Sequence, residues 1–292
     1  MAVETPRVEP DEPTKVERKG LKKGLYLLPS AFTAANVAMG YYAVMSALKG
    51  FQLLGGAEGD AAAAAVHINN AALAIGWAIL FDTLDGRIAR MTKTTTEIGV
   101  QLDSISDVLT FGIAPAVLTY VWAYGSTFQE GSPEHKFGWF VSFFFLMCGG
   151  FRLARFNVQA MRPRPLMEGT AKLDKKNFVG LPIPAAAGML AALIHFAPAP
   201  LRSYGGRTAE IYSGLMMALM ATLALLMVST VRYSSFKAIG GSRRTTRVVI
   251  LLVISVAMLV WLFSRQVLLV LMASYVLYGP LSRLFSLVRP RR

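Results

Sequence analysis

Long apolar runs separated by short polar segments dominate this chain. Several of the runs reach the roughly 20 residues that a helix needs to cross the hydrocarbon core of a bilayer. The pattern predicts an all-α fold, a polytopic integral membrane helical bundle of about eight transmembrane helices. Only Arg265 separates the last two expected spans. The eight spans are expected at residues 28–49, 65–88, 99–124, 137–159, 179–198, 210–231, 247–264 and 266–286.

The polar segments differ sharply in charge from one side of the expected bundle to the other. If the polar tail at residues 1–24 is cytoplasmic, 25 of the 30 Lys and Arg residues fall on that side and 5 on the other. This bias predicts that both termini are cytoplasmic, in a multi-pass protein of the cell membrane. The net charge of +13 then belongs mostly to the cytoplasmic face, where it attracts anionic lipid and anionic nucleotide-lipid. A nucleic-acid partner is not needed to explain it.

Four carboxylates interrupt this apolar pattern around the second and third expected spans. They belong to the pattern D-x-x-D-G-x-x-A-R, eight further residues, then G-x-x-x-D-x-x-x-D. The fixed positions are Asp82, Asp85, Gly86, Ala89, Arg90, Gly99, Asp103 and Asp107.

Helical spacing predicts that these acids converge. Asp82 and Asp85 are three residues apart near the end of one helix, and Asp103 and Asp107 are four apart near the start of the next. The short linker between them makes the two helices antiparallel neighbours. Four unpaired carboxylates at a membrane edge would repel one another, so we expect one or two bound divalent cations. All-oxygen ligation favours Mg²⁺ or Mn²⁺, ions that also bind substrate phosphates.

The remaining fixed positions suit a phosphorylated ligand. Gly86, Ala89 and Gly99 keep the surface low, so that a bulky ligand can approach the backbone. Arg90 offers a fork of donors to phosphate.

With every fixed position present, the pattern resembles the signature of the CDP-alcohol phosphatidyltransferases. These are integral membrane enzymes that transfer a phosphatidyl group from a CDP-linked lipid to an alcohol and release CMP. The resemblance implies that Asp82, Asp85, Asp103 and Asp107 hold the metal and that Asp107 is the general base. It also implies that the Gly, Ala and Arg positions line the nucleotide site, and that the protein is a homodimer among membrane lipids.

The first expected span carries polar residues on one face. Thr33 and Asn36 are three residues apart near its cytoplasmic end. They are candidates for contact with the nucleotide, and interhelical hydrogen bonding is the alternative. The three histidines lie away from the acidic residues, so we expect capping or hydrogen-bonding roles for them. The single cysteine, Cys148, excludes an internal disulfide within this chain.

Further runs resemble the branch of the family that makes phosphatidylserine. They lie at residues 149–157, 178–188 and 228–237, and the resemblance covers about residues 25–240. The expected organisation is therefore a membrane core at 25–240, followed by a C-terminal helical pair and basic tail at 241–292. Arg152 and Arg155, three residues apart, are candidates for binding the acceptor, and snorkelling to lipid headgroups is the alternative.

These observations leave three functional hypotheses. The first is transfer from CDP-diacylglycerol to L-serine. The second is the same chemistry with another acceptor, such as glycerol 3-phosphate or inositol phosphate, or with an archaeal-type lipid donor. The third, from a different class, is a cation transporter that uses the four aspartates as an ion path.

Overall fold

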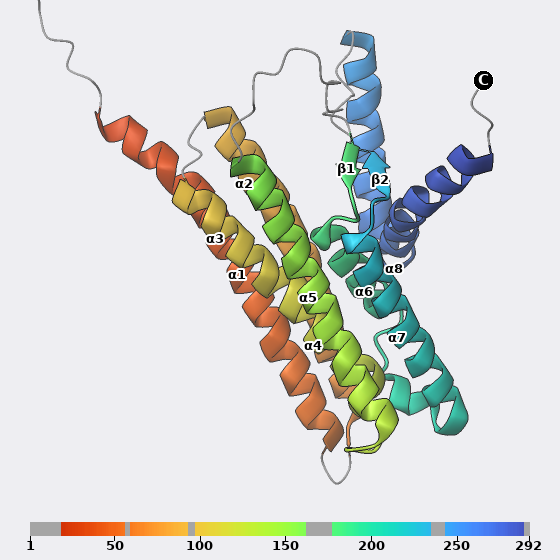
Figure 1. The fold of residues 1–292 in the computed structure, drawn as a ribbon. Coiled ribbons are helices and arrows are strands. Elements are labelled where there is room, and N and C mark those ends of the chain that lie inside the picture. Colours follow the sequence, from red (N-terminus) through yellow and green to blue (C-terminus); the bar gives the residue numbers. More distant parts are fainter. Residues whose placement is uncertain (1–18, 56–58, 93–96, 162–176, 235–242, 289–292) are drawn as a thin grey trace, which may run out of the picture.

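The computed structural model describes residues 19–55, 59–92, 97–161, 177–234 and 243–288, which form a helical bundle (Figure 1). Two three-residue strands, β1 (Asn177–Val179) and β2 (Arg232–Ser234), pair in antiparallel register. The expected all-α membrane bundle is confirmed, with this short ladder added to it. The helical elements are α1 (Lys19–Gly55), α2 (Ala61–Thr92), α3 (Glu97–Asp107), η1 (Val108–Ile113), α4 (Ala114–Thr119), η2 (Tyr120–Tyr124), α5 (Pro133–Met161), α6 (Ile183–Phe196), η3 (Leu201–Tyr204), α7 (Gly206–Val228) and α8 (Arg243–Val288).

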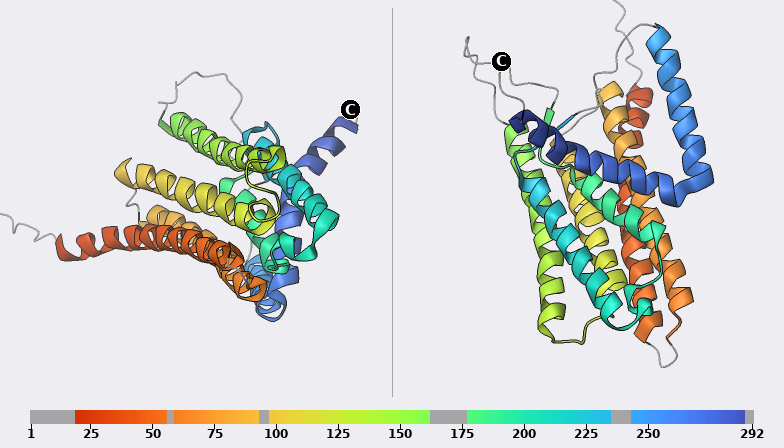
Figure 2. Two further views of the ribbon diagram at one scale, coloured as in Figure 1. Left: turned by 90° about the horizontal axis from the view of Figure 1, so that it is seen from below. Right: turned by 90° about the vertical axis from the view of Figure 1, so that its right-hand side faces the viewer.

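Seven helical segments of the described chain are long and apolar enough to cross a membrane. The first six match the first six predicted spans, whereas the last two predicted spans fall together in α8, so the number eight is not confirmed. Phe263 interrupts α8 with non-helical angles (φ −134°, ψ 48°), two residues before the predicted break at Arg265. The two arms of α8 meet there at a sharp bend (Figure 2). The seven segments are Ala31–Gly55, Ala61–Ile88, Ile98–Tyr124, Pro133–Val158, Ile183–Tyr204, Gly206–Val228 and Leu251–Leu284.

Small side chains let the first two helices pack closely. Ala43 and Ala47 on α1 and Ala64 and Ala71 on α2 are fully buried. Because lipid provides no hydrophobic drive for helices to associate, close backbone approach and van der Waals contact hold such a pair together. The result is an antiparallel α1–α2 hairpin, in which Asp82 and Asp85 lie near the C-terminal end of α2.

The helical segment from Glu97 to Tyr124 alternates twice between α-helical and π-helical winding. α3 ends at Asp107, and the next six residues form the π-helical segment η1, where the N–H of Ala114 donates to the carbonyl of Leu109. Pro115 follows directly and has no N–H to donate to a regular α-helical ladder. π-helical turns are a common way to accommodate such an interruption, and they are frequent at functional sites. This turn begins immediately after the last of the four aspartates.

The β ladder joins the start of α6 to the end of α7. Gly180 follows β1 with φ +83°, and its N–H donates to the Val231 carbonyl at 2.8 Å. A side chain at this position would collide with the Met227 carbonyl, so only glycine fits. The ladder lies at the same end of the bundle as the start of α1, the end of α2 and both ends of α8 (Figure 1).

Candidate metal and nucleotide site

Three of the predicted ligands come together between α2 and α3. One carboxylate oxygen from each of Asp82, Asp85 and Asp103 lies within 4.8 Å of the others. Asp85 is buried, and Asp82 and Asp103 are partly exposed. Helical spacing places the first two on one face of α2, and the antiparallel course of α3 brings the third against them. The sequence predicts that four carboxylates converge, and three of them do so here.

Asp107 lies one helical turn beyond Asp103 and is not a member of this group of three. Its carboxylate is buried, and its Oδ1 has no hydrogen-bond partner among the described residues. It interacts electrostatically with all three other aspartates and with the Arg152 guanidinium. A buried carboxylate oxygen without a donor is costly unless a ligand satisfies it. Asp107 therefore lies close to the same acidic group, one turn further along the helix.

This donor set fits a divalent cation. Three carboxylates whose oxygens lie within 4.8 Å of one another repel each other strongly in a low-dielectric setting, and a hard cation removes that repulsion. Oxygen ligands alone suit Mg²⁺ or Mn²⁺. The Oδ1 of Asp107, which has no hydrogen-bond partner among the described residues, is a further acceptor near this group.

Residues of α1 support the acidic group from the other side. The Thr33 hydroxyl donates to Asp85 Oδ2 at 3.0 Å, which fixes the orientation of that carboxylate. Asn36 is 0% exposed, and neither polar atom of its side chain has a hydrogen-bond partner among the described residues. A buried amide without a partner is costly, so this position favours a polar ligand that would satisfy it. Both residues are candidates for nucleotide contact in the sequence, and their contacts with this ligand stay a prediction.

A close helix crossing sets this geometry. A Cβ atom at Gly40 would lie 2.9 Å from the Cα of Thr110 in η1. The Thr110 hydroxyl in turn donates to the backbone carbonyl of Asn36 at 3.3 Å. Only glycine allows this approach, so Gly40 positions both Asn36 and the π-helical turn after Asp107. Gly40 could not be predicted from the sequence, because one glycine in an apolar span carries no local signal.

Of the other residues predicted for the nucleotide site, the structure describes the two glycines but not the alanine and arginine side chains. Gly86 follows Asp85 on α2 and is partly buried, and Gly99 is exposed on the first turn of α3. The side chains of Ala89 and Arg90 lie outside the part of the chain that the structure describes. Their predicted roles stay predictions.

The two arginines proposed for the acceptor lie on α5. Arg152 is 8% exposed, and its Nε has no hydrogen-bond partner among the described residues. Its guanidinium stands 4.7 Å from the centre of the Phe156 ring, and that of Arg155 stands 5.7 Å from the same ring. The Asn157 amide donates to Ser104 Oγ at 2.8 Å and ties α5 to α3. Arg152 thus interacts with Asp107 of the acidic site, and its Nε–H is available as a donor to a ligand.

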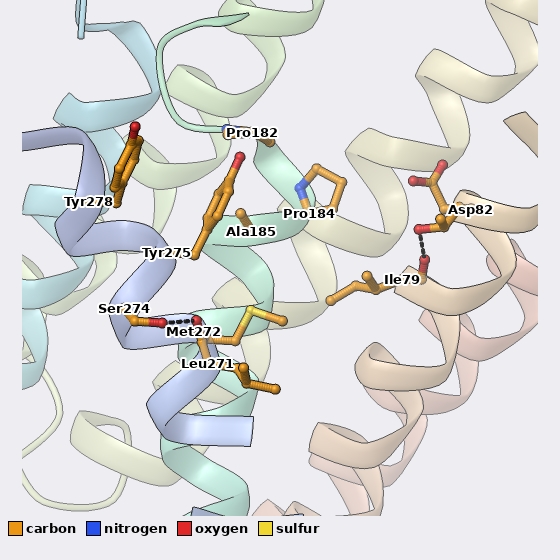
Figure 3. A pocket seen from close by; sticks show the side chains of 11 residues that line it. Ile79, Asp82, Pro182, Pro184, Ala185, Leu271, Met272, Ser274, Tyr275 and Tyr278 are labelled. Carbon is orange, nitrogen blue, oxygen red and sulfur yellow. Dashed lines mark hydrogen bonds between the residues drawn. The ribbon is translucent and has the colours of Figure 1, made fainter. Parts of the chain in front are cut away.

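A cavity of about 920 Å³ opens beside Asp82, between α2, α6 and α8 (Figure 3). Asp82 lies on one side of it and the Tyr275 and Tyr278 rings lie on the other (Figure 3). No residue of α8 was predicted to line this site, because the C-terminal spans carry no motif. The remaining lining residues are Ile79, Thr83, Pro182, Pro184, Ala185, Leu271, Met272 and Ser274.

Two of the three histidines, His135 and His195, make side-chain hydrogen bonds away from the acids, as predicted. His195 on α6 bonds Asn69 of α2 through Nδ1 (2.7 Å) and Ser264 of α8 through Nε2 (3.0 Å). His135 bonds the Tyr120 hydroxyl at 2.9 Å. The first of these networks joins three helices at the bend of α8 and has a structural role.

Comparison with known proteins places this geometry in a family. Residues 26–226 match the family described as CDP-alcohol phosphatidyltransferase. A CDP-diacylglycerol–serine O-phosphatidyltransferase of Helicobacter pylori (strain J99) is 31% identical over 265 residues, covering 91% of this chain and 94% of the relative. A Methanocaldococcus jannaschii protein of the same name is 34% identical over 173 residues, 59% of this chain and 67% of the relative. An archaetidylserine synthase of Methanothermobacter thermautotrophicus is 29% identical over 218 residues, 74% and 72% of the two chains. This chain belongs to the CDP-alcohol phosphatidyltransferase family.

Proposed function

We propose that this protein transfers the phosphatidyl group of CDP-diacylglycerol to L-serine in a metal-dependent reaction, giving phosphatidylserine and CMP. The observation that carries the proposal is the acidic group of Asp82, Asp85 and Asp103, with Asp107 facing it, in a family of such enzymes. Relatives named for transfer to serine, among them one aligned over 91% of this chain, support serine as acceptor.

Asp82, Asp85 and Asp103 would hold Mg²⁺ or Mn²⁺. When bound, such an ion supplies positive charge against the donor's pyrophosphate and against the charge that develops on departing CMP. The chain's part is positioning. Thr33 orients Asp85, and the unsatisfied amide of Asn36 offers both a donor and an acceptor to the nucleotide.

Asp107 is proposed as the general base. Its open Oδ1 accepts the proton of the serine hydroxyl as the serine oxygen attacks the phosphorus that bears the lipid. A new P–O bond to serine forms, the P–O bond to CMP breaks, and CMP leaves with the electron pair. Burial of Asp107 keeps bulk water from competing for the same phosphorus.

Arg152 is proposed to bind the serine carboxylate. It is buried, it interacts with Asp107, and its Nε is available to an anionic group. A planar guanidinium matches a carboxylate in a two-point contact. Arg155, on the same aromatic ring, is proposed as a second contact. A phosphorylated polyol would need a denser basic pocket than these two residues provide. The sequence offers candidates for such a pocket outside the described residues, at Arg162, Arg164, Lys172, Lys175 and Lys176.

We further propose that the site faces the cytoplasm, together with both termini. The Lys and Arg bias supports this orientation, since 25 of 30 lie on that side of the predicted spans. Asp82 and Asp85 lie near the C-terminal end of α2. That end of α2 is at the same end of the bundle as the start of α1 and the end of α8 (Figure 1). A homodimer within the membrane lipids is part of the same proposal and rests on the family resemblance.

The test uses the purified full-length protein with CDP-diacylglycerol and Mn²⁺ or Mg²⁺. CMP release is followed with L-serine, glycerol 3-phosphate or inositol phosphate as acceptor. Release with serine alone, abolished by EDTA, is expected. Release only with a phosphorylated polyol would reassign the acceptor. Absence of release with every acceptor, together with cation flux in vesicles, would replace the enzyme by a transporter.

A further inference from the structure

The second arm of α8 borders the cavity beside Asp82, although α8 lies outside the region that matches the family. Five of the eleven residues that line the cavity come from this arm, from Leu271 to Tyr278. α2 supplies Ile79, Asp82 and Thr83 on the opposite side. A helix outside the region that matches the family therefore closes one wall of a space that begins at Asp82, a proposed metal ligand.

This arm is held in a defined position. Tyr233 of β2 packs its ring 5.7 Å from that of Tyr275, and a side chain at Gly279 would overlap the Tyr233 ring. On α6, a Cβ atom at Gly188 would lie 3.1 Å from the Met272 sulfur. Contacts from two separate elements thus fix the face of α8 that looks into the cavity, and such pre-positioning is what a binding wall requires.

The chemistry of the walls selects an occupant. Apart from Asp82 and a few hydroxyls, the lining is aliphatic, aromatic or proline, and the Ser274 hydroxyl already donates to the Leu271 carbonyl at 2.9 Å. Free serine is small and doubly charged, and cytidine needs polar partners around its base. A ligand that is anionic at the Asp82 end through a metal-bound phosphate, and apolar beyond it, matches the donor lipid.

We propose that the second arm of α8 is a wall of the donor-lipid subsite. The glycerol neck of CDP-diacylglycerol would lie near Tyr275, and the first part of an acyl chain would lie along Leu271 and Met272, deeper toward the bend. This inference rests on the proposed function for its donor. It assigns donor-chain selectivity to a helix outside the family core.

Two leucines of the same helix provide a matched pair for the test. Leu271 lines the cavity and is 40% exposed, whereas Leu277 is 56% exposed and does not line it. Leu271→Trp should raise the KM for a long-chain CDP-diacylglycerol about tenfold, because overfilling such a space costs a corresponding free energy. A short-chain donor and serine should keep their KM values, and Leu277→Trp should behave as wild type. An equal rise in the KM for the long-chain and short-chain donors, or a rise in the KM for serine, would overturn the assignment.

A binding measurement separates this inference from the reaction itself. CDP-diacylglycerol with a diazirine near the ester end of one acyl chain is photolysed with the full-length protein. Label is expected on peptides containing Ile79 and Leu271, and excess unlabelled donor should remove it. A phosphatidylcholine with the same diazirine should not label them. Identical labelling by both lipids would overturn the subsite even if CMP release succeeds, whereas failed CMP release with specific labelling would overturn only the reaction.

Discussion

The Tyr233 hydroxyl donates a 3.3 Å hydrogen bond to the backbone carbonyl of Val276. That carbonyl is the one that Pro280, four residues later in α8, cannot satisfy, because proline has no N–H. Burial raises the pKa of Tyr233 to about 12, so the hydroxyl remains a donor at physiological pH. The Tyr233 hydroxyl of the β ladder therefore replaces the hydrogen bond that Pro280 removes from α8, the helix that lines the cavity.

Replacing Tyr233 by Phe should lower the stability of the protein, because it removes the donor to the Val276 carbonyl. The ring and its packing on Gly279 remain, but the buried carbonyl of Val276 loses its donor, which costs about 1–3 kcal/mol. We expect the variant to melt at a lower temperature than wild type in detergent, and its activity below that temperature to change little. Tyr41→Phe, on an exposed side chain, is the control and should melt as wild type. Unaltered melting of the Tyr233 variant would mean that the carbonyl finds another partner.

Gly40→Ala should disturb the site through the backbone. The added methyl group would meet the Cα of Thr110, which cannot move aside as a flexible side chain can. Separation of α1 from η1 would displace Asn36 and Asp107, so we expect at least a tenfold loss of kcat/KM, equivalent to about 1.4 kcal/mol. Gly214→Ala is the matched control, because open space surrounds that position on α7. Equal activity of the two variants would contradict the proposed role of the crossing.

Much of the acidic site could be predicted because its signal is local. The three-residue spacing of Asp82 and Asp85 and the short linker to α3 are enough to bring their carboxylates to Asp103. The four-residue spacing of Asp103 and Asp107 likewise sets Asp107 about 6 Å further along α3. The π-helical turn that follows Asp107 was not predicted, because it depends on packing against α1 as well as on Pro115.

The contribution of α8 could not be predicted for a different reason. The contacts that dock it join residues far apart in the sequence, such as Tyr233 with Gly279 and His195 with Ser264. Each depends on one glycine or one hydroxyl in an apolar run, where periodicity carries no information. The β ladder was missed because strands of three residues are too short to show alternation.

Asp107→Asn should separate metal binding from catalysis. Asp82, Asp85 and Asp103 remain to hold the ion, so Mn²⁺ binding followed by electron paramagnetic resonance should persist in part. Loss of a general base typically lowers the rate by about 10²–10⁴-fold, and we expect kcat to fall in that range. Asp85→Asn should instead weaken Mn²⁺ binding, since it removes a member of the group of three. Turnover near that of wild type in the Asp107 variant would remove it as the base.

Arg152→Ala should act on the acceptor rather than the donor. A charge-assisted hydrogen bond contributes about 1.5–3 kcal/mol, so the KM for serine should rise by about 10–100-fold. The KM for CDP-diacylglycerol should stay near that of wild type, and Arg152→Lys should recover part of the loss because it restores the charge without the planar fork. Arg155→Ala should have a smaller effect, since its guanidinium lies farther from the shared Phe156 ring and its side chain is less buried. Arg207→Ala, on an exposed side chain of α7, is the control. If the Arg152 variant changes the KM for the donor and leaves that for serine unaltered, Arg152 belongs to the pyrophosphate site and the serine carboxylate binds elsewhere.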